Sequence, residues 1–131
     1  MKNLLIKATH YTPEIDLNAE TNVLGICGKS YPENSFEFYA PVIEWVDKYL
    51  SNIETQKIIL NLELEYMNSS SLKVYFDLLD VVEIANDNKS VNIEINWIFD
   101  KDNDIAQETG EDFMEDFKNL NIALVVKDET V

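Results

Sequence analysis

Two stretches of the chain alternate between apolar and polar residues, and this alternation limits the possible folds more than any other feature. The first covers residues 57–66 and ends in LNLELEY, and the second covers residues 91–97 and reads VNIEINW. Successive side chains of a strand point to opposite faces, so both stretches predict strands with one apolar and one polar face. A strand covered on both faces would be apolar throughout. We therefore expect helices to cover one face of the sheet and to leave the other partly open.

Around these strands the apolar residues follow a helical period. Spacings of three and four recur from Phe36 to Ile53 and from Leu72 to Val82, which indicates two helices, each with one buried face. The remaining expected elements are a helix at 105–118 and short strands at 4–8, 13–17, 23–27 and 122–126, the third of these closed by Gly28. This order predicts an α/β fold. We expect a single domain over residues 1–131, with a mixed β-sheet and crossover helices largely on one face.

The charge of the chain narrows the classes of partner. Aspartate and glutamate total 25 against 10 basic residues, all of them lysine, which gives a net charge of −15. Such a chain repels phosphate backbones and anionic membrane surfaces, and without arginine it has no bidentate clamp for phosphate. We expect no nucleic-acid and no membrane partner. A basic patch on another protein is a suitable partner, and the open acidic face of the sheet is a candidate docking surface for it.

Two further features bear on the compartment. Cys27 is the single cysteine, so the chain has no internal disulfide, which fits a reducing environment. The first ten residues, MKNLLIKATH, contain neither the extended apolar stretch nor the small-residue cleavage site of a signal peptide. We therefore expect a cytoplasmic protein.

The sequence NSSS at 68–71, called the serine join below, lies where a predicted strand meets a predicted helix. Asparagine and serine are preferred helix caps, because their side-chain oxygens accept hydrogen bonds from free amides of the first turn. One such residue suffices for a cap, and here there are four in a row. The surplus hydroxyls lie beside the positive end of the helix dipole, where a phosphate is tolerated and strongly changes the local field. The serine join is therefore a candidate phosphorylation site.

Four segments together resemble the SiaC family of bacterial regulatory phosphoproteins, whose fold is similar to that of anti-sigma factor antagonists of the STAS type. They are TPEIDLN at 12–18, GKSYPENSFEFYAPVIEWVDKYL at 28–50, LELEYMNSSSLKVYFDLL at 62–79 and INWIFDKDNDIAQETGEDF at 95–113. The resemblance implies that the hydroxyl residue directly after the asparagine of the serine join, Ser69, is phosphorylated. The family pattern has threonine at this position, and Ser70 and Ser71 are the alternative acceptors.

The same resemblance implies a non-enzymatic switch between partners. A serine/threonine protein kinase adds the phosphate, and a metal-dependent protein phosphatase removes it. The unphosphorylated form binds and activates an effector such as a diguanylate cyclase, and phosphorylation at Ser69 blocks this binding. No cofactor or bound metal is implied. By analogy with the fold, the partner-binding residues are expected in the SYPEN segment and the serine join: Tyr31, Pro32, Glu33, Asn34, Asn68, Ser70 and Ser71.

An alternative class of function starts from the acidic stretch DKDNDIAQETGE at 100–111. Asp100, Asp102 and Asp104 have the spacing of the first ligands of a calcium loop, and with a divalent metal they would suit a small hydrolase. Ile105, however, occupies the place of the glycine that the sharp turn of a calcium loop needs. The stretch also reads as a turn followed by an acidic first turn of a helix, where carboxylates are favoured by the dipole.

Overall fold

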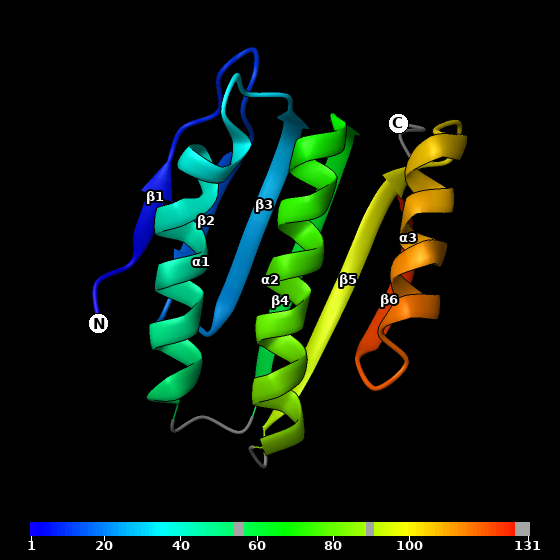
Figure 1. The fold of residues 1–131 in the computed structure, drawn as a ribbon. Helices are drawn as coiled ribbons and strands as arrows, with labels where there is room; N and C mark the ends of the chain where they lie inside the picture. Colours follow the sequence, from blue (N-terminus) through cyan, green and yellow to red (C-terminus); the bar gives the residue numbers. More distant parts are fainter. Residues whose placement is uncertain (54–56, 89–90, 128–131) are drawn as a thin grey trace.

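The computed structural model describes residues 1–53, 57–88 and 91–127 (Figure 1). Its strands form a mixed sheet in which spatial order follows chain order, β1-β2-β3-β4-β5-β6. The first three strands pair in antiparallel fashion, and β3 to β6 pair in parallel. The strands are β1 (Leu4–Ile6), β2 (Glu14–Asn18), β3 (Val23–Ser30), β4 (Lys57–Met67), β5 (Asn92–Asp100) and β6 (Asn121–Lys127).

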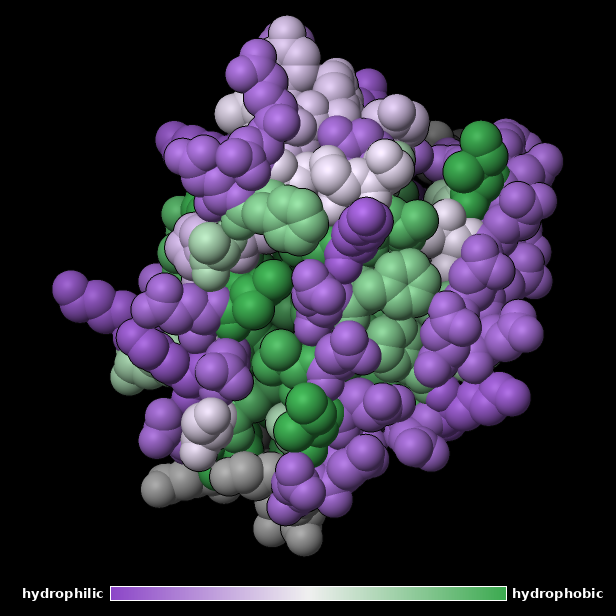
Figure 2. Space-filling model, viewed as in Figure 1, coloured by the Kyte–Doolittle hydropathy of each residue, from purple (hydrophilic) through white to green (hydrophobic). Residues whose placement is uncertain are grey.

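The helices α1 (Ser35–Ser51), α2 (Ser69–Asn88) and α3 (Asp104–Asp116) connect the parallel strands and lie on one face of the sheet (Figure 1). In the same view, Figure 2 shows hydrophobic residues gathered between the helices and hydrophilic residues along their outward sides. The predicted α/β architecture, a mixed sheet with helices on one face, is therefore confirmed. Within the described part of the chain, no helix is long and apolar enough to cross a membrane.

The period-two stretches divide as expected between a buried and an open face. On β4, Ile58, Leu60, Leu62 and Leu64 are buried beneath the helices. The residues between them belong to the opposite, open face, and on β5 the same alternation buries Ile93, Ile95, Trp97 and Phe99. Burial of these side chains supplies most of the stabilisation of the sheet, at about 25 cal/mol for each Å² of apolar surface removed from water.

Strand β3 does not end at Gly28, as its sequence predicts, but continues to Ser30. Gly28 has φ +136, a conformation that side-chain-bearing residues rarely adopt, and the register with β4 shifts between Gly28 and Lys29. A Cβ at Gly28 would also lie 3.1 Å from Pro13 Cα. The glycine therefore makes an irregularity within the strand and not its end. The extra residues carry β3 to the edge where β4 ends, and this positions Ser30 at the site described below.

The buried face of α1 also differs from the predicted one. Phe36 is 56% exposed, and Ile53 lies beyond the end of the helix. The helix buries Tyr39, Val46 and Leu50 of the predicted stripe, and it adds Val42, Trp45 and Tyr49 to the buried face. These aromatic side chains can be buried because their polar tips find partners: the indole of Trp45 donates to the backbone of Lys2, and the hydroxyl of Tyr49 donates to Asn22.

Candidate functional site

The serine join lies at the end of the sheet where β3 and β4 finish and where α1 and α2 begin (Figure 1). This end, formed by the carboxyl ends of the parallel strands, is called the sheet edge. The backbone amide of Asn68, directly after β4, donates to the carbonyl oxygen of Ser30 at 2.9 Å. Because Ser30 is the last residue of β3, this bond holds the start of α2 against the start of the loop that leads to α1. The SYPEN segment and the serine join, which sequence reasoning singled out separately, are thus neighbours.

Asparagine caps both helices at this edge. Asn68 Oδ1 accepts from the backbone amide of Ser71 at 2.9 Å, and Asn34 Oδ1 accepts from the amide of Glu37 at 3.1 Å. These are the side-chain-to-N3 bonds expected of N-cap residues, and the predicted cap in the serine join is therefore confirmed. Two helix N-termini, each with amides pointing outward, meet beside Ser69. The local field there favours negative charge.

A buried network of hydroxyl groups joins the two helices beneath the surface. Ser71 Oγ lies 2.7 Å from Ser30 Oγ and 3.1 Å from Ser35 Oγ, while Ser35 Oγ is 2.8 Å from Ser70 Oγ. Ser30 Oγ in turn lies 2.6 Å from the hydroxyl of Tyr39. Ser30, Ser35 and Ser71 are at most 1% exposed. Burial of three hydroxyls without partners would be costly, and here each finds at least two.

The network continues to Tyr75, whose hydroxyl donates to that of Tyr39 at 3.1 Å. Burial raises the pKa of Tyr39, although its hydrogen bonds with Ser30 and Tyr75 act in the opposite direction. The pKa of Tyr75 lies well above its ordinary value, first because of burial and then because of the nearby Tyr39. Both phenols therefore stay neutral at physiological pH, and each hydroxyl keeps its proton for the hydrogen bonds of the core.

The three serines of the join differ sharply in accessibility. Ser69, the first residue of α2, is exposed. Ser70 is half-buried and hydrogen-bonded to Ser35 and to Asn68 Oδ1. Ser71 is 0% exposed and belongs to the buried network. Of the three hydroxyls, that of Ser69 is the one open to an approaching enzyme.

The predicted partner residues outside the join lie in the connection between β3 and α1. Tyr31 and Pro32 are half-buried, and Glu33 and Asn34 are exposed. Because Ser30 is bonded to Asn68 and Ser35 to Ser70, this short connection is held against the serine join at both of its ends. The structure therefore brings the predicted partner-binding residues of the SYPEN segment and the serine join together at this end of the sheet.

The acidic stretch after β5 forms a turn and a helix start. Asp100 Oδ1 accepts from the amide of Asp102 at 2.9 Å, and Asp104 begins α3 behind the cap Asn103. In the described residues, no three or more His, Cys, Asp or Glu side chains are grouped so that they could hold a metal ion. The interpretation of this stretch as a turn with an acidic first helical turn is confirmed.

Sequence reasoning missed a row of tyrosines at the same edge of the sheet. The rings of Tyr11 and Tyr31 lie 5.3 Å apart and those of Tyr31 and Tyr66 lie 5.6 Å apart, each pair edge to face. Tyr11 is 60% and Tyr66 54% exposed. The three residues are far apart in the chain and follow no common period, so no local signal could have shown that they meet.

The fold and this edge define a class of protein: a STAS-like regulatory domain, with helices on one face of a mixed sheet and a serine-rich helix start at the sheet edge. Residues 6–127 match the model of the SiaC family of regulatory phosphoproteins. The chain belongs to this family.

Individual relatives agree with this assignment. An uncharacterized protein of Pseudomonas aeruginosa strain UCBPP-PA14 is 36% identical over 116 residues, which cover 88% of this chain and 90% of that protein. The solved structure of SiaC of Pseudomonas aeruginosa has a TM-score of 0.87 at 33% identity, covering 97% of this chain and all of that one. A chain from the crystal structure of the diguanylate cyclase SiaD in complex with its activator SiaC, also from Pseudomonas aeruginosa, matches at 34% identity. Its TM-score is 0.87, and the match covers 95% of this chain and 99% of that chain.

Proposed function

We propose that this chain is a non-enzymatic binding module whose unphosphorylated form binds and activates a diguanylate cyclase, and that phosphorylation of Ser69 blocks this binding. Family membership supports a regulatory phosphoprotein. The effector class rests on the relative that is crystallised with the cyclase SiaD as its activator. A serine/threonine protein kinase adds the phosphate, and a metal-dependent protein phosphatase removes it.

The observation that carries the proposal is the gradient of accessibility along the serine join. A kinase must bring the acceptor hydroxyl up to the γ-phosphate of its nucleotide, and buried hydroxyls cannot reach it. Ser71 is fully buried and Ser70 is tied to Ser35, whereas Ser69 is exposed. This difference in accessibility supports Ser69 over the two alternative acceptors.

The effect of the phosphate follows from its position. It adds close to two negative charges at a surface that the unmodified protein offers as an uncharged hydroxyl. The partner surface includes the serine join and the adjoining connection with Tyr31, Pro32, Glu33 and Asn34. When an effector covers this surface, a phosphate at Ser69 must lose its water, which costs several kcal/mol unless the partner supplies cations. Binding is lost at the interface while the fold stays intact.

Two experiments test the proposal. Incubation with the cognate kinase and ATP, followed by peptide mass spectrometry, should place the phosphate on Ser69, and phosphate found only outside residues 69–71 would contradict it. In binding assays with the cognate cyclase, Ser69→Asp should weaken the complex while Ser69→Ala keeps it. Equal affinity of the two variants would rule out the switch.

A further inference from the structure

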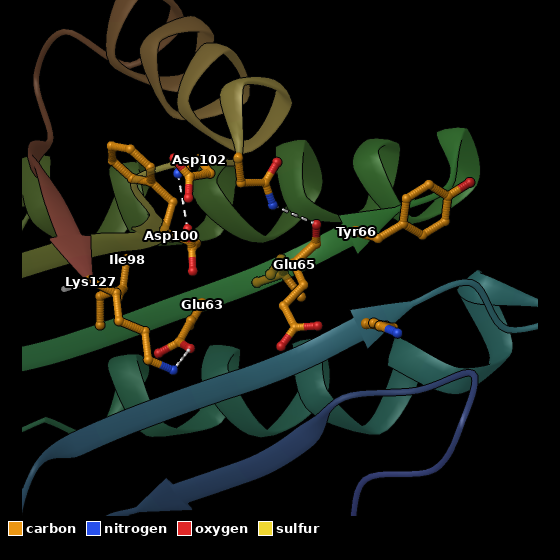
Figure 3. A pocket seen from close by; sticks show the side chains of 11 residues that line it. Glu63, Glu65, Tyr66, Ile98, Asp100, Asp102 and Lys127 are labelled. Carbon is orange, nitrogen blue, oxygen red and sulfur yellow. Dashed lines mark hydrogen bonds and ion pairs between the residues drawn. The ribbon is translucent and has the colours of Figure 1, made fainter. Parts of the chain in front are cut away.

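The open face of the sheet, on the side away from the helices, carries a long hollow. One part, of about 470 Å³, lies over the ends of β4 and β5, and a second part, of about 340 Å³, lies over β2 and β3. Both parts are lined by Glu63 and Ile98, so they are neighbours on this face and are treated together as one groove. Figure 3 shows Glu63, Glu65 and Asp100 projecting into its first part. We call this hollow the open-face groove.

The lining of the groove contains a larger share of acidic residues than the chain as a whole. Its two parts are lined by six carboxylates and two lysines, and one of the lysines, Lys127, is paired with Glu63 at 2.9 Å. The carboxylates are Glu14, Asp16, Glu63, Glu65, Asp100 and Asp102. Carboxylates on a concave, partly enclosed surface focus a negative potential that attracts cations.

The groove ends at an exposed aromatic side chain. Tyr66 lines the first part of the groove and is also the last ring of the row that runs through Tyr31 to Tyr11. Its ring is 54% exposed and is held edge to face against Tyr31. Figure 3 shows this ring directed away from the carboxylates, at the end of the groove. A guanidinium group suits both features, because it stacks on ring faces and forms paired hydrogen bonds with carboxylates.

We propose that the open-face groove is a second docking surface and that it takes an arginine-bearing segment of a partner protein. The arginine side chains lie along Glu65 and Asp100, since Glu63 is already paired with Lys127, and one of them stacks on Tyr66. The aromatic ring and the carboxylates favour arginine over lysine, because a guanidinium group lies flat on a ring and forms paired hydrogen bonds with a carboxylate, whereas an ammonium group acts as a point charge. This surface lies on the opposite side of the sheet from the helix layer that Ser69 begins. We therefore expect it to work in both phosphorylation states, although its Tyr66 end adjoins Tyr31 of the proposed effector surface.

A pair of synthetic peptides tests this docking surface. The probe is a 14-residue peptide with four arginines spaced by alanines, and its control carries glutamine at those four positions. Titration into the isotope-labelled protein at about 150 mM salt, where long-range attraction between surface charges is screened, is followed by backbone NMR. The arginine peptide should shift the signals of residues 63–66 and 98–103 first, and the glutamine peptide should shift none. Shifts spread evenly over the acidic helix surfaces, or no shifts, would overturn the proposal.

Matched variants sharpen the test. Tyr66→Ala and Glu65→Gln should each weaken binding of the arginine peptide about fivefold, within the range of exposed cation–π and ion-pair contacts. Tyr66→Phe, which keeps the ring, and Glu115→Gln on the exposed surface of α3 should leave the affinity within about twofold. If Tyr66→Ala and Glu65→Gln bind as tightly as the original chain, the groove is not the site. A third peptide carries lysine at the four arginine positions. If it binds as tightly as the arginine peptide, the groove recognises positive charge and not arginine, which contradicts the proposal.

One variant separates this inference from the proposed switch. Ser69→Asp adds a negative charge three residues from Tyr66 and should not weaken binding of the arginine peptide, because a negative potential attracts cations. Loss of peptide binding in Ser69→Asp would overturn the independence of the two surfaces. Conversely, failure of the peptide experiment leaves the effect of Ser69→Asp on the cyclase untouched, so the two proposals fail by different results.

Discussion

Ser71 Oγ lies 2.7 Å from Ser30 Oγ, and this contact ties the first turn of α2 to the last residue of β3, 41 positions earlier in the chain. Both side chains are fully buried. Because the same hydroxyl of Ser71 also meets Ser35, the starts of both helices are fixed relative to the sheet edge. Ser69, two residues before Ser71, stands on this rigid frame as an exposed hydroxyl. A phosphate added there meets a pre-formed surface.

The first prediction contrasts two serines of the join. Ser71→Ala should lower the free energy of unfolding by about 1–2 kcal/mol, because it removes a buried hydroxyl that contacts Ser30 and Ser35. Ser69→Ala should change it by less than about 0.5 kcal/mol, as is typical of exposed sites. Urea unfolding of both variants at pH 7 measures the difference. Equal destabilisation would mean that Ser71 is not held in the network.

The second prediction concerns the acidic variant of the acceptor residue. A negative charge at the first position of α2 gains about 0.3–1 kcal/mol from the helix dipole, and repulsion from exposed carboxylates such as Glu65 is of similar size. The carboxylate of Glu63 contributes less to this repulsion, because it is paired with Lys127. The free energies of unfolding of Ser69→Asp and Ser69→Ala should therefore differ by less than about 1 kcal/mol. A drop in melting temperature of roughly ten degrees in calorimetry would show instead that the charge melts the helix start.

The third prediction tests the packing of α3 on the sheet. A Cβ at Gly110 would contact the Trp97 ring and would lie 2.7 Å from Leu124 Cδ2. Gly110→Ala should therefore cost about 1–3 kcal/mol, since the buried Trp97 cannot move aside freely. Gly25→Ala is the matched control, because its nearest neighbour would be a backbone oxygen of Asp16 at 3.9 Å. Thermal unfolding that finds both variants equally stable would contradict this packing.

The fourth prediction is a loss of stability at alkaline pH. The pKa of the buried Tyr75 in the folded protein lies well above the ordinary value of 10.0. Its contribution to stability is thus fully present below pH 10 and is lost as the pH rises further, because the unfolded chain releases the proton first. Between pH 10 and 11.5 the free energy of unfolding should fall less steeply for Tyr75→Phe than for the original chain. The two slopes should differ by up to about 1.4 kcal/mol per pH unit. Parallel slopes in urea titrations would show that Tyr75 ionises freely in the folded state.

Local patterns were sufficient to predict most of the fold. The strict alternation of residues 57–66 and 91–97 is typical of strands with one open face, and it correctly predicted β4 and β5. The same alternation predicted that the helices cover one face of the sheet. Residue preference likewise identified the helix cap in the serine join, which is Asn68. These features depend on residues that are neighbours in the chain, so sequence carries them directly.

The parts that sequence could not predict depend on residues that are distant in the chain. Gly28 reads as the end of a strand, and its place inside β3 depends on Pro13 of the neighbouring segment. Phe36 fits the helical period of the apolar residues and is nevertheless exposed, whereas Trp45 is buried with its indole donating to the distant backbone of Lys2. The hydroxyl network and the tyrosine row join residues from strands, helices and loops that are distant in the chain, and no period in the sequence marks them.

The most direct test of the switch uses the phosphorylated protein itself. Phosphoserine is incorporated at position 69 during synthesis, and the unmodified chain and the phosphorylated chain are each titrated by calorimetry into the cognate diguanylate cyclase. Cyclase activity is followed in parallel. The account predicts that the unmodified chain binds and stimulates the enzyme, and that the phosphorylated chain binds at least about 30-fold more weakly, equivalent to about 2 kcal/mol. Equal affinity and equal stimulation by the two forms would contradict it.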